Sequence, residues 1–193
     1  MAAATTMVLV RHGEIIRPEG TSNFDQAPLS SRGEQQVATL AHHWPAPAPD
    51  IVITSDLLRS VQTGRILGAI LGVPLDLRVG LREWTPDEGN LPQREFLALE
   101  ERCWKDLDFV PPSGERLVDA QGRIDRTLRD IARSHRGGVV AVAGHGALFS
   151  LFTAATQGVR PTRERKNAVP FAGYALVRYR SRFELVSDFR TVA

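Results

Sequence analysis

Three short apolar runs, at residues 7–10, 51–53 and 139–143, constrain the fold of this 193-residue chain more than any other feature. Each run is apolar without alternation, which is typical of a strand buried on both faces of a sheet. Each is followed by a turn with polar residues or glycine, and then by a helical pattern. The order predicts an α/β fold in three layers, a doubly wound, mostly parallel sheet with helices on both faces.

Capping residues and apolar stripes predict where the first helices lie. Ser30 and Ser31 open a helix, and its core-facing stripe consists of Val37, Leu40, Ala41 and Trp44. Ser55 and Asp56 are expected to open the next helix as N-cap and first-turn acid, and Gly72 to end it. A polar or glycine residue is thus expected at the ends of both helices.

Residues 84–113 interrupt this alternation. They contain prolines at both ends of a helical pattern near 93–107, and we expect a small cap-like insertion over one edge of the sheet. Residues 74–77, just before it, suggest a fourth strand. Ser113 is expected to cap a long helix whose buried seam consists of Leu117, Ile124, Leu128 and Ile131.

The last quarter of the chain contains one more helix and a pair of strands. Residues 147–157 are apolar almost all round, which predicts a buried helix that ends at Gly158. Residues 174–179 and 183–187 flank a short turn and predict two terminal strands. Between helix and strands lies a basic run that we interpret as a solvated loop, with contact to an acidic substrate as the alternative; it consists of Arg160, Arg163, Arg165 and Lys166.

Length, composition and charge limit the classes of function. The simplest organisation is one domain over residues 1–193, with 42% hydrophobic and 24% charged residues, as in ordinary globular proteins. A formal net charge of +2 is too small for a general nucleic-acid or membrane binder. No run approaches the roughly 18 apolar residues of a membrane span, and the N-terminus lacks a signal-peptide pattern, so we expect a cytoplasmic protein.

Metal sites and disulfides are not expected. The single cysteine, Cys103, excludes an internal disulfide and any multi-cysteine metal site, and its surroundings predict a buried helical thiol. His42, His43 and His135 are assigned to helix surfaces or ends, because their spacing lacks the companion ligands that zinc prefers. We therefore predict neither a metal nor another cofactor.

Charged residues follow each of the three buried runs. In doubly wound sheets, functional sites gather beyond the carboxyl ends of the strands. If the three strands are neighbours, His12 and Arg11 should meet Arg59 and His145 at one rim. Glu83, at the end of the stretch that begins with the fourth strand, adds a carboxylate at the same place. An arginine beside a histidine at such a rim suits an anionic, tetrahedral group.

This set of side chains is nearly sufficient to cleave a phosphate monoester through a covalent intermediate. A neutral imidazole can attack phosphorus and divide one difficult step into two. Guanidinium groups and a second, protonated imidazole can hold the phosphoryl oxygens. A carboxylic acid can protonate the departing alkoxide and then activate water. We expect Arg11, Arg59 and a protonated His145 to lower the pKa of His12 by like-charge repulsion.

The motifs resemble the histidine phosphatase superfamily, also called phosphoglycerate mutase-like. They occur in the family's order over nearly the whole chain, at residues 10–14, 28–36, 55–63, 81–83, 113–115 and 144–146. The resemblance implies that His12 is the phosphorylated nucleophile and Glu83 the proton donor. It also implies that Arg11, Arg59 and His145 form the phosphate pocket.

Two departures from the family's pattern concern the substrate. Relatives often carry an asparagine a few residues after the arginine–histidine–glycine element, where the nearest candidate here is Asn23 in a longer loop. Residues 84–89 match neither the aromatic motif of small phosphatases nor the Arg-His-Tyr of the mutases. The prediction is a phosphatase for a small phosphorylated substrate; a phosphoglycerate mutase-like phosphomutase and a non-catalytic phosphate-binding module are the alternatives. The oligomeric state stays open.

Overall fold

The computed structural model describes residues 3–192. Its strands are β1 (Thr5–Arg11), β2 (Ile51–Thr54), β3 (Leu75–Leu77), β4 (Val139–Gly144), β5 (Tyr174–Tyr179) and β6 (Phe183–Arg190). Its helices are α1 (Ser31–His42), α2 (Leu58–Leu71), the short 3-10 helix η1 (Val79–Leu81), α3 (Gln93–Lys105), α4 (Leu117–Ser134), α5 (Gly146–Gln157) and α6 (Arg163–Ala168). Strands and helices alternate through most of this order, as expected.

The strands form one mixed sheet in the order β3-β2-β4-β1-β5-β6. Strands β1 to β4 pair in parallel, whereas β5 is antiparallel to both β1 and β6. The three apolar runs are therefore adjacent at the centre of the sheet. Arg11 pairs with Gly144, and Thr54 pairs with Ala143, so the carboxyl ends of β1, β4 and β2 are level.

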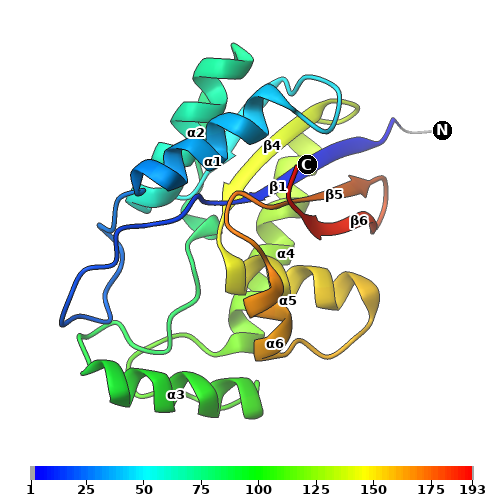
Figure 1. The fold of residues 1–193 in the computed structure, drawn as a ribbon. Helices are drawn as coiled ribbons and strands as arrows, with labels where there is room; N and C mark the ends of the chain where they lie inside the picture. Colours follow the sequence, from blue (N-terminus) through cyan, green and yellow to red (C-terminus); the bar gives the residue numbers. More distant parts are fainter. Residues whose placement is uncertain (1–2, 193) are drawn as a thin grey trace.

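Helices cover both faces of this sheet, which confirms the three-layer prediction (Figure 1). On β1, Val8 and Val10 belong to the same core cluster as α1 and α2, represented by Val37, Leu40 and Leu67. Met7 and Leu9 point to the opposite face, into the cluster of α4 and α5, represented by Leu128, Phe149 and Phe152. The alternation of side chains along one strand thus builds two cores.

Several helix ends agree with the predictions. Ser30 caps α1, because its side chain accepts the Gly33 N–H at 3.0 Å. Gly72 and Gly158 follow α2 and α5 in the left-handed conformation, at φ of 71° and 69°. Trp44 lies beyond the end of α1, so the apolar stripe of that helix stops at Ala41.

Two predicted N-caps are wrong. The helix after β2 begins at Leu58, three residues after Ser55, and the Ser55 hydroxyl is turned into the protein instead. The long helix begins at Leu117, and Ser113 donates to the carboxylate of Asp87 at 2.7 Å. In both cases the serine precedes its helix by more than one residue, and a buried or nearby polar partner takes its hydroxyl.

Residues 84–113 lie at the edge of the sheet that the carboxyl ends of its parallel strands form. Helix α3 of this segment lies beyond the carboxyl ends of the parallel strands, near α6 (Figure 1). Trp84, Cys103 and Trp104 anchor the segment in the core cluster of α4 and α5. The insertion therefore stands over the rim at which the sequence places its functional residues. Among the described residues, no helix is long and apolar enough to cross a bilayer.

The basic run before β5 is not a solvated loop. Residues 163–168 form α6, and the side chains of Arg163 and Lys166 bind the buried carboxylate of Glu100 on α3. Arg160 donates to the carbonyl of Lys105, at the end of α3. The run is ordered because it carries the cations that hold the insertion to the body of the protein.

Candidate active site

The structure brings the five predicted site residues together at one rim of the sheet. The His12 N–H donates to the Gly144 carbonyl at 2.9 Å, and the rings of His12 and His145 lie 5.3 Å apart. A cavity of about 770 Å³ opens in front of them, and Arg11, His12, Arg59 and Glu83 line it. His145 is fully buried beside His12. The convergence predicted from strand order is confirmed.

The imidazole of His12 has a defined orientation. Its Nδ1 lies 2.7 Å from the Gly13 carbonyl oxygen, which can only accept, so this nitrogen carries the proton. The pKa of His12 is lowered well below 6.5, first by burial and then by the charges of Arg59 and Arg11. The ring is therefore neutral near pH 7, and Nε2 carries a lone pair.

A close contact between two glycines holds the turn that carries His12. A Cβ atom on Gly13 would lie 2.4 Å from the Gly33 carbonyl oxygen. A Cβ atom on Gly33 would lie 2.0 Å from the carbonyl oxygen of Glu14. Only glycine fits at both positions, so the backbone after β1 can rest directly on the first turn of α1.

Arg11 is buried against an aromatic ring. Its guanidinium donates to the Val169 carbonyl and lies 4.0 Å from the centre of the Phe171 ring. Burial lowers the pKa of Arg11 to about 10, and the Arg11 Nε has no hydrogen-bond partner among the described residues. A cation that is partly shielded from water and keeps an unused donor is a ready partner for an anion.

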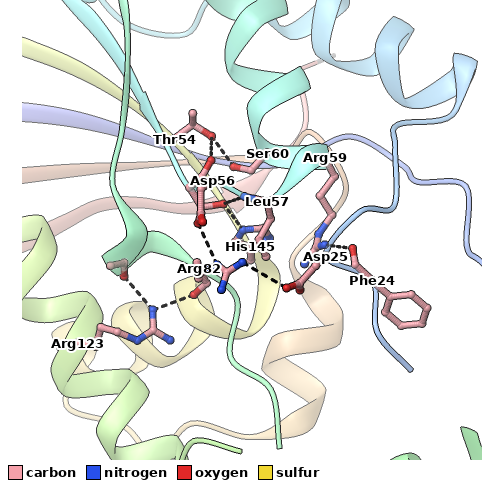
Figure 2. Close-up of polar contacts among 12 residues, drawn as sticks. Phe24, Asp25, Thr54, Asp56, Leu57, Arg59, Ser60, Arg82, Arg123 and His145 are labelled. Atoms are coloured by element: carbon pink, nitrogen blue, oxygen red, sulfur yellow. Dashed lines mark hydrogen bonds and ion pairs between the residues drawn. The ribbon is translucent and has the colours of Figure 1, made fainter. Parts of the chain in front are cut away.

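Arg59 lies in the first turn of α2 and is 5% exposed. One of its nitrogens donates to the Phe24 carbonyl at 2.5 Å, as Figure 2 shows. Its pKa is lowered mainly by burial, which the charges of Glu83 and Asp25 oppose. Arg59 and Arg11 thus flank the nucleophilic face of the site with two partly desolvated cations.

The expected protonation of His145 is wrong for the ligand-free site. The pKa of His145 is lowered well below 6.5, first by burial and then by Arg59 and His12. Its Nε2 lies 2.7 Å from the Ser55 hydroxyl, which also accepts the Leu57 N–H. Ser55 can therefore donate to Nε2, which puts the ring proton on Nδ1. That Nδ1 is buried without a partner among residues 3–192.

The glycines beside His145 leave room for side chains of the protein itself. A Cβ atom on Gly144 would meet the ring of Phe149 at 2.6 Å. A Cβ atom on Gly146 would lie 3.2 Å from the Arg11 Nε. These glycines therefore permit close packing of Phe149 and Arg11 beside His145.

Glu83 is held at the amino end of α5. Its Oε1 accepts the N–H groups of Trp84 and Leu148 at 2.9 and 3.0 Å, and its Oε2 accepts that of Ala147 at 3.0 Å. Three backbone donors therefore orient the carboxyl group. Oε2 takes only one of them and keeps capacity for a further hydrogen bond.

Two further arginines, Arg82 and Arg123, hold the segment before Glu83 in place. Arg82 pairs with Asp56 at 3.0 Å and with Asp25 at 3.3 Å (Figure 2). Arg123 donates to the carbonyl oxygens of Gly80 and Arg82, each at 2.9 Å. Both arginines fix the chain immediately ahead of Glu83, so the position of its carboxyl group is well determined.

Sequence reasoning missed two residues of the site, Ser55 as the partner of His145 and Phe171. The ring of Phe171 lies over Arg11 and 5.7 Å from that of His12. The signal for Phe171 was present, because the turn before an antiparallel neighbour of β1 must lie beside the end of β1. The predicted terminal strands were not paired with β1 in the sequence analysis.

The cysteine and the other three histidines lie outside this site. Cys103 is a buried thiol in α3, and burial raises its pKa to about 11. His43 and His135 occupy the C-cap positions of α1 and α4, and His42 is exposed. Within residues 3–192, no group of three or more His, Cys, Asp or Glu side chains is arranged to hold a metal ion.

The fold and the site define the class: an α/β protein with a buried histidine between two arginines at the rim of its sheet. The family model described as the histidine phosphatase superfamily (branch 1) matches residues 7–189. The chain belongs to this superfamily, which confirms the resemblance seen in its motifs.

Known relatives carry both mutase and phosphatase names. A probable phosphoglycerate mutase GpmB of Enterobacter sp. (strain 638) is 30% identical over 171 residues, covering 82% of this chain and 77% of the relative. An uncharacterized phosphatase PhoE of Bacillus subtilis is 28% identical over 158 residues, covering 80% and 79%. The mycobacterial glucosyl-3-phosphoglycerate phosphatase has the same fold, with a TM-score of 0.78 at 22% identity over 95% of this chain and 98% of that chain.

Proposed function

We propose that this chain is a phosphatase that hydrolyses phosphate monoesters through a phosphohistidine on His12. The observation that carries the proposal is the geometry of His12. Its Nδ1 is occupied by the Gly13 carbonyl, and its lowered pKa keeps the ring neutral, so Nε2 is available as a nucleophile between two arginines. The similarity to the phosphatase PhoE supports hydrolysis.

In the first step, Nε2 of His12 forms a bond to phosphorus, and the bond from phosphorus to the alcohol oxygen breaks. Arg11, Arg59 and His145 bind the phosphoryl oxygens, and the unpartnered Arg11 Nε and His145 Nδ1 are donors that a phosphate can use. Glu83, in its acid form, gives its proton to the departing alcohol oxygen. Oε2 is the oxygen with room for that proton.

In the second step, water attacks the phosphohistidine. Glu83, now a carboxylate, takes one proton from the water as its oxygen bonds to phosphorus. The bond between phosphorus and Nε2 breaks, inorganic phosphate leaves, and both His12 and Glu83 return to their starting states. The protein's own cations supply the charge stabilisation in both steps, and the substrate is a small phosphorylated molecule.

Residues 84–113 act as a cap in this proposal, within one domain that spans the chain. Seven of the cavity-lining residues belong to this segment, namely Trp84, Thr85, Asp87, Glu88, Phe96, Leu97 and Glu100. The tip of the 14–29 loop meets the cap, because Thr21 and the N–H of Ser22 donate to Asn90 at 2.5 and 3.2 Å. Asn23 lies in the same cavity wall. Loop and cap together enclose the alcohol part of the substrate.

Release of phosphate from p-nitrophenyl phosphate tests the proposal. We expect steady turnover by the unmodified chain, loss of turnover in His12→Ala, and unchanged turnover in His42→Ala, whose ring is exposed on α1. Activity in His12→Ala equal to that of the unmodified chain would overturn the mechanism.

The relatives named phosphoglycerate mutase make phosphoryl transfer back to the substrate the second candidate. A mutase needs a phosphorylated enzyme at the start of each cycle, so its isomerisation depends on a bisphosphate primer. We expect steady phosphate release without a primer and no isomerisation of a phosphoglycerate. Isomerisation that exceeds phosphate release would establish the mutase instead.

A further inference from the structure

The cavity has two ends of different character. Arg11, His12, Arg59 and Glu83 form the phosphate end at the rim of the sheet. Arg17, on the exposed part of the 14–29 loop, lines the same cavity and is part of no ion pair within residues 3–192. The outer part, between that loop, the cap and α6, is where the alcohol part of a substrate would lie.

The cations of the outer part are neutralised by carboxylates of the protein. Arg82 is paired with Asp25 and Asp56. Arg123 is paired with both oxygens of Glu115, at 2.9 and 2.6 Å. These arginines are therefore already engaged, and a negatively charged substrate group would have to compete with carboxylates that are built into the site.

Glu100 provides the counter-charge for Lys166, the cation that lines the outer cavity from α6. The carboxylate of Glu100 is 6% exposed, and it accepts from Lys166 at 2.5 Å and from Arg163 at 3.0 Å. Glu100 and Lys166 both line the cavity. A buried carboxylate that two cations hold is fixed in place, and its removal would leave both cations uncompensated.

Two further carboxylates add negative charge to the outer cavity. Asp87 and Glu88 line it from the cap, and within residues 3–192 neither is part of an ion pair. Asp87 accepts instead from the N–H groups of Gly89 and Leu91, both at 3.1 Å. An anionic group on the substrate's alcohol would therefore meet net negative charge here.

Apolar side chains supply much of the remaining wall of the outer cavity. They are Phe24, Val79, Phe96 and Leu97. Val79 is 65% exposed and Leu97 is 43% exposed. Such surface gains free energy when an apolar group covers it.

From these contacts we propose that the substrate's alcohol is uncharged and partly apolar, and that Glu100 is a specificity-determining residue because it cancels the charge of Lys166. The inference rests on the proposed phosphatase function and adds the class of its substrate. A carboxylate or a second phosphate on the alcohol is selected against, although several relatives have names that refer to phosphoglycerates.

A matched pair of substrates tests the proposal on the unmodified chain. 4-Carbamoylbenzyl phosphate and 4-carboxybenzyl phosphate have the same size and the same kind of leaving alcohol, and they differ by one negative charge. We expect kcat/KM to be at least about tenfold higher for the carbamoyl compound, which corresponds to about 1.4 kcal/mol. Equal values, or a preference for the carboxylate, would overturn the proposal.

The variant Glu100→Gln tests the residue assignment. It keeps the side-chain shape but leaves Lys166 and Arg163 without their counter-charge, so we expect the preference for the carbamoyl compound to fall by about tenfold. Glu101→Gln is the control, because Glu101 is exposed on the same helix and, within residues 3–192, pairs only with Lys105. A folded Glu100→Gln protein with an unchanged preference would overturn the role of Glu100.

A wrong function and a wrong substrate class would give different results with these substrates. If neither benzyl phosphate nor p-nitrophenyl phosphate is hydrolysed, the phosphatase function itself is wrong. If both are hydrolysed and the carboxylate is not disfavoured, the function stands and the substrate class is wrong. The preference of the unmodified chain is measured without any substitution, so it decides the question even if Glu100→Gln does not fold.

Discussion

The Ser55 hydroxyl lies 2.7 Å from Nε2 of His145, although the two residues come from different strand ends and are separated by 90 positions in the chain. Both side chains are completely buried. The hydrogen bond leaves Nδ1 as the one donor of His145 that a bound phosphate can still use. A serine that sequence reasoning assigned to a helix cap is therefore part of the phosphate site.

Ser55→Ala is expected to impair both stability and turnover. It leaves the buried Nε2 of His145 without a partner, which costs about 1–3 kcal/mol in the free energy of unfolding. It also removes the hydrogen bond that orients the His145 ring, so kcat should fall. Chemical denaturation and steady-state kinetics measure the two effects. Ser134→Ala, at an exposed position at the end of α4, should change neither; full activity in Ser55→Ala would remove Ser55 from the site.

Arg59→Ala should reduce kcat by about 10³ or more, because it removes a charge that stabilises the transition state of phosphoryl transfer. Arg65→Ala is the matched control, since Arg65 lies on the same helix but is exposed. Steady-state kinetics with p-nitrophenyl phosphate separate the two. Similar losses in both variants would mean that Arg59 acts only through the charge or stability of α2.

Gly13→Ala is expected to be strongly destabilising. Its Cβ would lie 2.4 Å from a backbone oxygen of Gly33, which cannot move aside as a side chain would. We expect a loss of more than about 2 kcal/mol in the free energy of unfolding. Gly122→Ala in α4 is the control, because its Cβ would meet only the flexible end of Arg126, and alanine is the better helix former. A thermal melt in which both variants resemble the unmodified chain would contradict this contact.

Stability should fall as the pH drops below about 6.5. Both His12 and His145 have folded-state pKa values well below 6.5, so the unfolded chain binds more protons as soon as the pH passes below that value. A pKa difference of one unit corresponds to about 1.4 kcal/mol for each ring. Denaturation at pH 7 and pH 5 should therefore show a larger loss for the unmodified chain than for His145→Asn. His42→Asn, at an exposed position, should behave as the unmodified chain does; equal losses in all three would contradict neutral burial.

Much of the fold was predictable because its signals are local. The apolar runs of β1, β2 and β4 have no polar alternation, and the general rule for sites in such sheets then placed His12, Arg59 and His145 at one rim. The two misplaced caps, Ser55 and Ser113, show the limit of local signals, because their hydroxyl groups bind partners far away in the chain.

The features of the site that the sequence did not predict depend on contacts between segments that are far apart in the chain. Phe171 reaches Arg11 only because β5 pairs antiparallel with β1. Lys166 is ordered only because Glu100, on a helix of the insertion, lies opposite to it. No periodicity or spacing within a short stretch encodes either contact, although Phe171 and Lys166 both line the cavity.

The most direct test is rapid quenching of the reaction with a phosphorus-labelled aryl phosphate, followed by mapping of the labelled peptide. We predict an acid-labile, alkali-stable phosphoryl group on His12 that forms faster than steady-state turnover and is absent from His12→Ala. A label on any other residue, or turnover at full rate through no covalent intermediate, would contradict it.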